Sequence, residues 1–220
     1  MVERITRSGL LVRVGGLLAG AAGLGFLRPG AAPAASGVSC ILTPEMTEGP
    51  YYISGEKLRR NITEGRPGAR LDLHLSVVDA ATCRPIGGAA VDIWHADAGG
   101  VYSGFGAGAS SRTFMRGIQK TDKTGLAVFR TAYPGWYQGR TVHIHVKVHV
   151  GGDVVHTGQL FFSDLLTDAV YLRLPYSRRP NRDVRNATDM IFRNGGVRSL
   201  LTIRRKGTGY VGSIAMGVRR

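Results

Sequence analysis

Residues 142–150 read VHIHVKVHV, the most regular alternation of polar and apolar side chains in the chain. Because successive side chains of a β-strand point to opposite faces, this period of two predicts a half-buried strand. The turn residues GGD at 151–153 and the strand-like run VVHTGQLFF at 154–162 follow directly. This part of the sequence therefore predicts two strands joined by a tight turn.

Similar runs occur on both sides of this stretch. From Leu71, aliphatic residues alternate with polar ones as far as Val77, and AAVDIWHAD at 89–97 indicates another strand. A hairpin is predicted by TFMRGIQKTD and LAVFRTA, which are joined by the turn DKTG at 122–125. A closing hairpin over 199–218 is predicted by SLLTIRR, KGTG and YVGSIAMGV. Helix is expected only at 164–171 and roughly 183–194. Many short strands with little helix predict a β-sandwich or a small barrel.

The composition narrows the class of protein. The chain has 220 residues, of which 43% are hydrophobic and 20% charged. It is too apolar to be disordered and long enough to bury a core, so one globular domain is expected, over residues 37–220. Two cysteines exclude a disulfide-dense miniprotein and a four-cysteine zinc site.

Residues 1–36 have the composition of an export signal. Three arginines precede the uncharged run VGGLLAGAAGLGFL at 14–27, and small residues follow it. This order is typical of a secretory signal, and the apolar run is shorter than the ~20 residues that a spanning helix needs. We predict a low-order N-terminal export segment and a secreted or extracytoplasmic protein. Anchoring by an uncleaved N-terminal segment is the alternative.

An oxidising compartment changes how the two cysteines are interpreted. Cys40 and Cys83 are the only cysteines of the chain, so they form its one intrachain pair. We hypothesise that they are bridged, which on the chain-entropy model stabilises the fold by roughly 4 kcal/mol.

The net charge of +14 by itself suggests an anionic partner, such as nucleic acid or an acidic polymer. The charge is unevenly distributed. Residues 1–40 carry +3, residues 41–172 carry +1, and residues 173–220 carry +10. The middle of the chain, which holds the residues with metal-binding chemistry, is therefore nearly neutral.

His143 and His145 lie two apart on the predicted strand, so their imidazoles point to the same face. Two neighbouring imidazoles suit a transition metal but do not complete a site. Tyrosines cluster nearby, at Tyr133 and Tyr137 in YPGWY and at Tyr102 in GGVYS. A phenolate is a hard anionic donor suited to Fe(III), and a metal ion lowers the pKa of its ligand. Judged by spacing alone, packing remains an alternative role for these tyrosines.

Four stretches resemble the intradiol ring-cleavage dioxygenases: TPEMTEGPYY (43–52), WHADAGGVYSG (94–104), YPGWYQGRTVHIHVKV (133–148) and TGQLFF (157–162). The resemblance covers about residues 40–218 and is closest to the exported, single-domain, catechol-cleaving branch. It implies an all-β fold, a mixed β-sandwich with short helices and long loops. It also implies non-haem Fe(III) held by two tyrosines and two histidines.

Matched motif by motif, the resemblance implies that the metal ligands are Tyr102, Tyr137, His143 and His145. The active-site arginine of the family falls on Arg140 and its glutamine on Gln159. Tyr133 is the alternative to Tyr137, but the P-G-x-Y register favours Tyr137.

The remaining aromatic residues and histidines receive simpler interpretations. His95 is expected to be a hydrogen-bonded core or near-site histidine, and Trp94 a core residue. His74 and His156 are expected to be ordinary strand residues. Tyr51, Tyr52 and Trp136 either line the pocket or pack against the fold.

In the reaction that the resemblance implies, a catechol chelates the iron and displaces Tyr137, while Tyr102 stays bound. Arg140 stabilises the negative charge that develops on the ring, and Gln159 orients it. Insertion of both atoms of O2 between the hydroxylated carbons gives a cis,cis-muconate-type diacid, as in catechol 1,2- or protocatechuate 3,4-type enzymes.

The expected partners are thus a small-molecule catechol and O2. No nucleic acid is expected, nor a stable membrane association after signal removal, and a homodimer is left open. Two alternatives remain at this point. One is a Cu/Zn dismutase-like enzyme, which also uses an H-x-H strand. The other is a non-catalytic secreted β-sandwich binding module with a basic, polyanion-binding tail.

Overall fold

The computed structural model describes residues 40, 42–106 and 108–219. The chain divides into two units, residues 1–36 and 37–220. The first unit, with the predicted export signal, lies outside the described residues, and that prediction stays a prediction. All described residues belong to the second unit.

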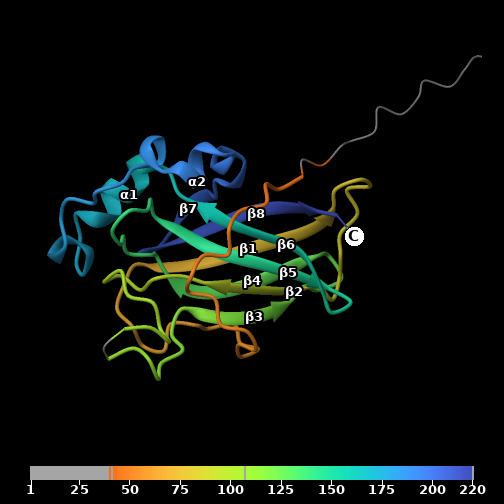
Figure 1. The fold of residues 1–220 in the computed structure, drawn as a ribbon, viewed down its shortest axis with the longest axis horizontal. Coiled ribbons are helices and arrows are strands. Elements are labelled where there is room, and N and C mark those ends of the chain that lie inside the picture. Colours follow the sequence, from red (N-terminus) through yellow and green to blue (C-terminus); the bar gives the residue numbers. More distant parts are fainter. Residues whose placement is uncertain (1–39, 41, 107, 220) are drawn as a thin grey trace, which may run out of the picture. The chain divides into compact units, whose positions relative to one another are not determined.

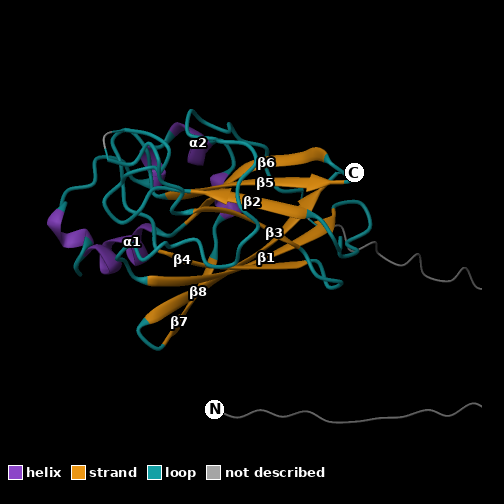
Figure 2. Cartoon of the chain, turned by 90° about the horizontal axis from the view of Figure 1, so that it is seen from below, coloured by secondary structure: helices purple, strands orange, loops and turns teal. Residues whose placement is uncertain are grey.

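Within the described residues, the second unit forms two four-stranded sheets (Figure 1 and Figure 2). The first sheet has the strand order β4-β1-β8-β7, with β1 (Arg70–Asp79), β4 (Leu126–Ala132), β7 (Thr202–Lys206) and β8 (Gly209–Val218). The second sheet has the order β3-β2-β5-β6, with β2 (Ala90–Trp94), β3 (Arg116–Lys120), β5 (His143–Val150) and β6 (Asp153–Phe161). Strands β1 and β8 are parallel and the other neighbours antiparallel. The predicted mixed β-sandwich is confirmed.

The core lies between the sheets, and the period-two pattern decides which side chains reach it. The aliphatic residues of β1 that the pattern selects are all fully buried, namely Leu71, Leu73, Leu75 and Val77. Strand β5 contributes Ile144, Val146 and Val148 in the same way. The outward face of each strand therefore carries the polar residues.

Strand β5 is not half-buried as predicted, because the outer face of its sheet is covered. Residues 43–57, here called the cover segment, cross that face from β6 to β3, and in Figure 1 the segment (orange) passes in front of β6 and β5. Near its start the backbone N–H of Met46 donates to the carbonyl of Thr157 on β6 at 2.9 Å. At its end the carbonyl of Lys57 accepts from Ile118 on β3 at 2.9 Å. The polar face of β5 thus lies beneath a second layer of chain.

The hairpin predicted around the turn DKTG is wrong. Strand β3, before the turn, belongs to the second sheet, and β4, after it, to the first. Asp122 Oδ1 accepts hydrogen bonds from the backbone N–H groups of Thr124 and Leu126, at 2.8 and 3.0 Å, and so forms a tight local turn. The turn residues were identified correctly, but they carry the chain from one sheet to the other. The closing hairpin of β7 and β8 is confirmed.

The helix predicted at 164–171 is confirmed as α1 (Asp164–Tyr171), capped by the Ser163 side chain. The one predicted over 183–194 is confirmed only in part. It consists of a 3₁₀ turn (Asn186–Thr188) and the short helix α2 (Met190–Arg193), with Asp189 extended between them. Asp189 caps α2 by accepting from the backbone N–H groups of Ile191 and Phe192, so a continuous helix is interrupted there.

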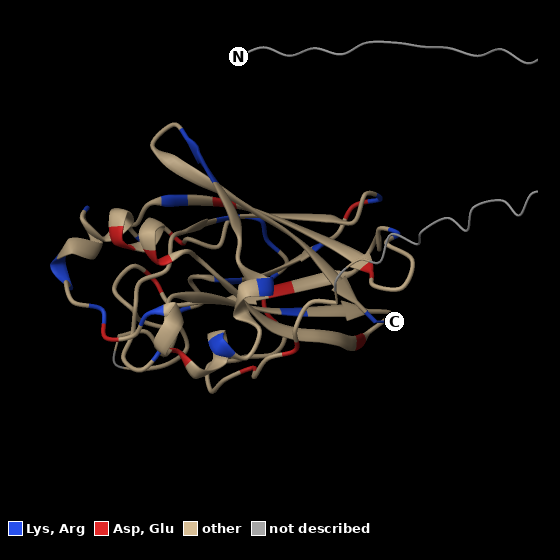
Figure 3. Ribbon diagram, turned by 90° about the horizontal axis from the view of Figure 1, so that it is seen from above, with Lys and Arg blue, Asp and Glu red and all other residues tan. Residues whose placement is uncertain are grey.

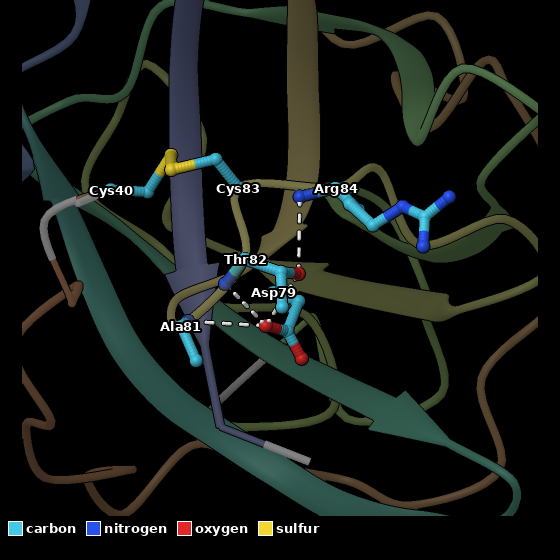
Figure 4. Close-up of a disulfide and its surroundings, with 6 residues drawn as sticks. All are labelled: Cys40, Asp79, Ala81, Thr82, Cys83 and Arg84. Atoms are coloured by element: carbon cyan, nitrogen blue, oxygen red, sulfur yellow. Dashed lines mark hydrogen bonds between the residues drawn. A yellow bond between two sulfur atoms is a disulfide. The ribbon is translucent and has the colours of Figure 1, made fainter. Parts of the chain in front are cut away.

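Cys40 and Cys83 form a disulfide, as hypothesised (Figure 4). Cys83 lies in the turn after β1, where Asp79 Oδ1 accepts hydrogen bonds from the backbone N–H groups of Ala81 and Thr82. The bridge therefore attaches the start of the described chain, just before the cover segment, to the end of a core strand.

Part of the basic C-terminal region is paired internally. Arg182 bonds to Asp164 and Asp168, and Arg185 also bonds to Asp168. Figure 3 shows Lys and Arg spread over several elements instead of along one stripe. In the part of the chain that the structure describes, no helix is long and apolar enough to span a membrane.

Candidate metal centre

The candidate site is built on the outer face of the second sheet. His143 and His145 project from β5 to this face, opposite the core residues Ile144 and Val146. On the neighbouring strands the register sets Gln159 of β6 and Trp94 of β2 directly beside His145. Tyr102 follows β2 in a loop, and Tyr137 and Arg140 precede β5 in another. The cover segment lies above this group.

The four side chains singled out as ligands converge. The Nε2 atoms of His143 and His145 lie 3.0 Å apart, and the Tyr137 hydroxyl lies 3.3 Å from Nε2 of His143. The Tyr102 ring stands 5.5 Å from that of Tyr137 and 6.1 Å from that of His145, centroid to centroid. Tyr133 is elsewhere. It is fully buried in the core, where its hydroxyl lies 2.7 Å from Oγ1 of Thr167.

Burial keeps both histidines neutral. Desolvation, assisted by the nearby Arg140 cation, lowers the pKa of His143 to about 3, and burial lowers that of His145 well below its ordinary value. Nδ1 of His143 donates to the carbonyl of Thr141 at 2.7 Å, which leaves the Nε2 lone pair pointing into the site. Without a metal ion, the two Nε2 atoms share a single proton and form one hydrogen bond. A bound metal ion would instead accept the Nε2 lone pairs of both histidines.

The tyrosines complete a donor set that fits Fe(III). The Tyr102 hydroxyl is buried beside that of Tyr137 and forms no hydrogen bond of ordinary length and angle with the described residues. Burial raises the pKa of both Tyr102 and Tyr137 by more than the nearby Arg140 lowers it, so neither ionises at neutral pH unless a further cation binds. A trivalent ion supplies that cation, and two phenolates offset most of its charge. Among the described residues, no three or more His, Cys, Asp or Glu side chains are placed so that they could hold a metal ion together, so a dismutase-like histidine cluster is not favoured.

Arg140 is held at the edge of the site by two side chains. Its Nη2 donates to Oε1 of Gln159 at 2.6 Å, and its Nε donates to Oδ2 of Asp189 at 2.8 Å. Gln159 is oriented in turn, because its Nε2 donates to the Thr47 carbonyl of the cover segment at 3.0 Å. The guanidinium is therefore fixed in place before any ligand arrives.

Asp189 is the site residue that sequence reasoning missed. Its side chain is fully buried and, besides Arg140, it accepts from the backbone N–H of Thr141 at 2.9 Å. Burial acts to raise the pKa of Asp189, but its hydrogen bonds, first that from Arg140, outweigh burial and hold the pKa below the ordinary value. The sequence signal was an Asp before a short apolar run, which indicates a helix cap and says nothing of a partner 49 residues away.

A small cavity opens onto the two tyrosines. It has a volume of about 250 Å³, and its lining includes Tyr51, Val101, Tyr102, Phe105 and Tyr137. A cavity of about 150 Å³ holds benzene, so a single aromatic ring fits here. Tyr51 stacks on Tyr102 with centroids 4.3 Å apart and therefore forms part of the pocket wall.

The other histidines lie apart from the four converging side chains, as expected. His95 is fully buried, with Nδ1 2.8 Å from the Ala96 carbonyl and Nε2 2.8 Å from Oγ1 of Thr131. Burial lowers its pKa to about 4. His156, on β6, contacts Glu45 of the cover segment at 3.1 Å. His74 lies on β1, in the other sheet.

A mixed β-sandwich with a two-histidine, two-tyrosine cluster on one outer sheet face defines a candidate non-haem metal protein. The sequence matches the family model described as Dioxygenase over residues 47–165. An intradiol ring-cleavage dioxygenase from Tetranychus urticae is 37% identical with a TM-score of 0.77, over 82% of this chain and 95% of that one. The dioxygenase domain of a dioxygenase–carbohydrate-binding fusion from Streptomyces sp. SirexAA-E is 32% identical with a TM-score of 0.64, over 81% and 99%. The chain belongs to the intradiol ring-cleavage dioxygenase family.

Curated relatives include a catechol 1,2-dioxygenase from Acinetobacter baylyi, 35% identical over 126 residues, which are 52% of this chain and 40% of the relative. A catechol 1,2-dioxygenase from Acinetobacter lwoffii is 34% identical over 101 residues, 43% of this chain and 32% of the relative. The chain thus spans about a third to two fifths of these two relatives.

Proposed function

We propose that this protein is a non-haem Fe(III) intradiol dioxygenase. It inserts both atoms of O2 between the hydroxylated carbons of a catechol and releases a cis,cis-muconate-type diacid. The observation that carries the proposal is the convergence of Tyr102, Tyr137, His143 and His145 beside a fixed guanidinium. The two tyrosines of this group also line a ring-sized cavity. Family membership and the names of the relatives support the same reaction class.

The two histidines and two tyrosines would hold the iron. When bound, Fe(III) supplies the Lewis-acid and redox chemistry that makes a catechol reactive toward O2. The protein would offset two of the three positive charges with phenolate oxygens and complete the set with two neutral imidazoles, which burial keeps unprotonated.

The two tyrosines have different roles in this proposal. Tyr102 is 4% exposed and stacked under Tyr51, so it is fixed in place. Tyr137 is only partly buried and borders the cavity. Tyr137 therefore has room to move as the substrate binds, and its phenolate oxygen would accept one of the two catechol protons, while a hydroxide ion would take the other and leave as water. This step needs no separate carboxylate base.

Arg140 stabilises the negative charge that the ring acquires as its hydroxyls lose their protons. Gln159 and Asp189 hold the guanidinium so that it does not have to reorganise during the reaction. Preorganised donors of this kind contribute about 3–4 kcal/mol to transition-state stabilisation. Tyr51, Val101 and Phe105 line the cavity and place the ring beside the two tyrosines.

The test is a visible spectrum of the purified, iron-loaded protein with product analysis. A ferric-tyrosinate protein is wine-red, its absorption changes when catechol is added, and the product is the muconate-type diacid. A colourless protein with stoichiometric iron, or a semialdehyde product from cleavage beside the hydroxyls, would exclude the proposal.

We further propose that the enzyme acts outside the cytoplasm. The composition of residues 1–36 supports this, and so does the Cys40–Cys83 disulfide, because disulfides persist in oxidising compartments. Fractionation of the producing cells, with a free-thiol assay on the unreduced protein, tests it. Cytoplasmic protein with two reactive thiols would contradict it.

A further inference from the structure

The two candidate histidine ligands are oriented by different means. The ring of His143 is anchored by the hydrogen bond from Nδ1 to the Thr141 carbonyl, at 2.7 Å. Nδ1 of His145 is buried as well, but no described residue forms a hydrogen bond with it. Metal-bound histidines nearly always have such a hydrogen bond, because it orients the ring and selects the tautomer. His145 therefore needs another means of orientation.

The indole of Trp94 supplies the missing constraint. Trp94 and His145 are direct partners in the β2–β5 register. Their rings are stacked with an interplanar angle of 6° and centroids 4.9 Å apart, within the range of favourable aromatic pairs. Trp94 is 1% exposed and His145 also 1%, so neither ring has space to tilt. Gly49 also approaches the imidazole closely, because a Cβ added there would lie 3.2 Å from Cε1 of His145.

Trp94 is itself braced by the cover segment. The ring of Tyr52 packs on Trp94 with centroids 4.8 Å apart. On Tyr52 sits the ammonium of Lys147, 3.6 Å from the ring centroid, and this ammonium forms an ion pair with Glu48. Lys147, Tyr52, Trp94 and His145 thus form a continuous row of contacts, in which Tyr52 of the cover segment links Lys147 of β5 to the indole that stacks on the candidate ligand.

We propose that Trp94 is the positioning residue of His145. Its stacked indole fixes the plane of the imidazole and the direction of Nε2, the task that a hydrogen bond performs for His143, and Tyr52 holds the indole in place. This inference deepens the proposed function and rests on the iron site proposed there.

The experiment measures the affinity for Fe(III), supplied as its citrate complex, in Trp94→Leu, Trp94→Phe and the control Phe161→Leu. Phe161 is equally buried and its ring lies 6.2 Å from His143, which has its own hydrogen bond. Trp94→Leu should bind iron about 10–100-fold more weakly, the range for residues that orient a metal ligand. Trp94→Phe keeps a stacking ring and should stay near the wild-type affinity, as should Phe161→Leu.

Denaturant unfolding of the metal-free variants separates positioning from general damage. Trp94→Leu and Phe161→Leu both leave cavities and should both unfold more easily, but only the first should lose affinity. Equal losses of affinity in the two variants, or wild-type affinity in Trp94→Leu, would overturn the inference. If Trp94→Leu does not fold, Tyr52→Leu replaces it and should weaken iron binding in the same direction.

If the wild-type protein takes up no iron, the proposed function is refuted. The positioning of His145 by Trp94 is then tested by a second measurement, NMR of the metal-free protein. In NMR spectra of the metal-free wild type, the His145 ring protons should form one set, shifted upfield by the indole. In Trp94→Leu they should broaden or split as the ring reorients. A single sharp set in both proteins would show that Trp94 does not position His145.

Discussion

Strand β1 reads RLDLHLSVVD and strand β5 reads HIHVKVHV, so both alternate aliphatic residues with polar ones that include histidine. Their inward faces are alike, since Leu73 and Ile144 are both fully buried in the core. Their outward faces differ. His74 of β1 is only half-buried, whereas His143 and His145 of β5 are 2% and 1% exposed.

The difference arises from what covers each sheet. The cover segment lies over β5, and the loops that carry Tyr102, Tyr137 and Arg140 close around it. On the outward face of β1, by contrast, Asp72 pairs with two exposed arginines, Arg70 and Arg130. The comparison shows that the polar face of a strand becomes a candidate reactive site when other segments of the chain cover it and remove its side chains from water. Desolvation then keeps the imidazoles neutral and strengthens the fields of the remaining charges.

The largest difference between the outward faces of β1 and β5 should appear when one histidine is removed from each face. His143→Ala should reduce both the iron content and ring cleavage to background, because it deletes a ligand, and Tyr102→Phe should do the same. His74→Ala should leave both near the wild-type level. Iron analysis and product formation check this, and retained turnover in His143→Ala and Tyr102→Phe would show that the ligand assignment is wrong.

The second largest effect is expected for Arg140, the cation beside the outward face of β5. Arg140→Gln should lower kcat by about 10²–10³ while the protein keeps its iron, because a preorganised charge is lost and the ligands are not. Arg130→Gln, on the outer face of β4, is the matched control and should be close to wild type. A wild-type kcat in Arg140→Gln would remove Arg140 from the mechanism.

A smaller effect should follow from a change on the inward face of β5. Ile144→Val removes one methylene group from the core and should lower the free energy of unfolding by about 0.5–1.5 kcal/mol. Iron content and kcat should remain unchanged, although Ile144 lies between His143 and His145 in the chain. Denaturant unfolding gives the first quantity, and loss of iron in this variant would mean that the two faces are not independent.

The smallest effect is expected at Asp72, on the outward face of β1. Burial acts to raise the pKa of Asp72, but hydrogen bonds and charges from Arg70 and Arg130 outweigh it and hold the pKa below its ordinary value. The stabilisation is therefore present above the ordinary pKa of about 4 and is lost as the pH falls through the folded value. Because solvent screens these arginines, Asp72→Asn should cost less than about 1 kcal/mol at pH 7.

Unfolding of wild type and Asp72→Asn across pH 2–7 measures this difference, which should shrink toward zero at the acid end. A difference that grows on acidification would contradict the assigned direction of the pKa shift.

Much of the fold was open to prediction because it depends on local patterns. The alternation of aliphatic residues in β1 and β5 identified core side chains correctly, and the helix at 164–171 was also predicted. The strands that pair with β3 and β4 could not be predicted. The sequence of a tight turn is the same whether it joins two neighbouring strands or carries the chain from one sheet to the other. The same holds for Asp189, whose capping role is local and whose contact with Arg140 is not.

By itself, the sequence determined the strand periodicity, the adjacency of His143 and His145, and the motifs that resemble one enzyme family. Only the tertiary structure decided that both faces of β5 are buried, that Asp189 holds Arg140, and that Trp94 stacks on His145. The reason is physical. A period of two is set within each strand by backbone geometry, whereas the solvation and orientation of a side chain depend on segments far away in the chain.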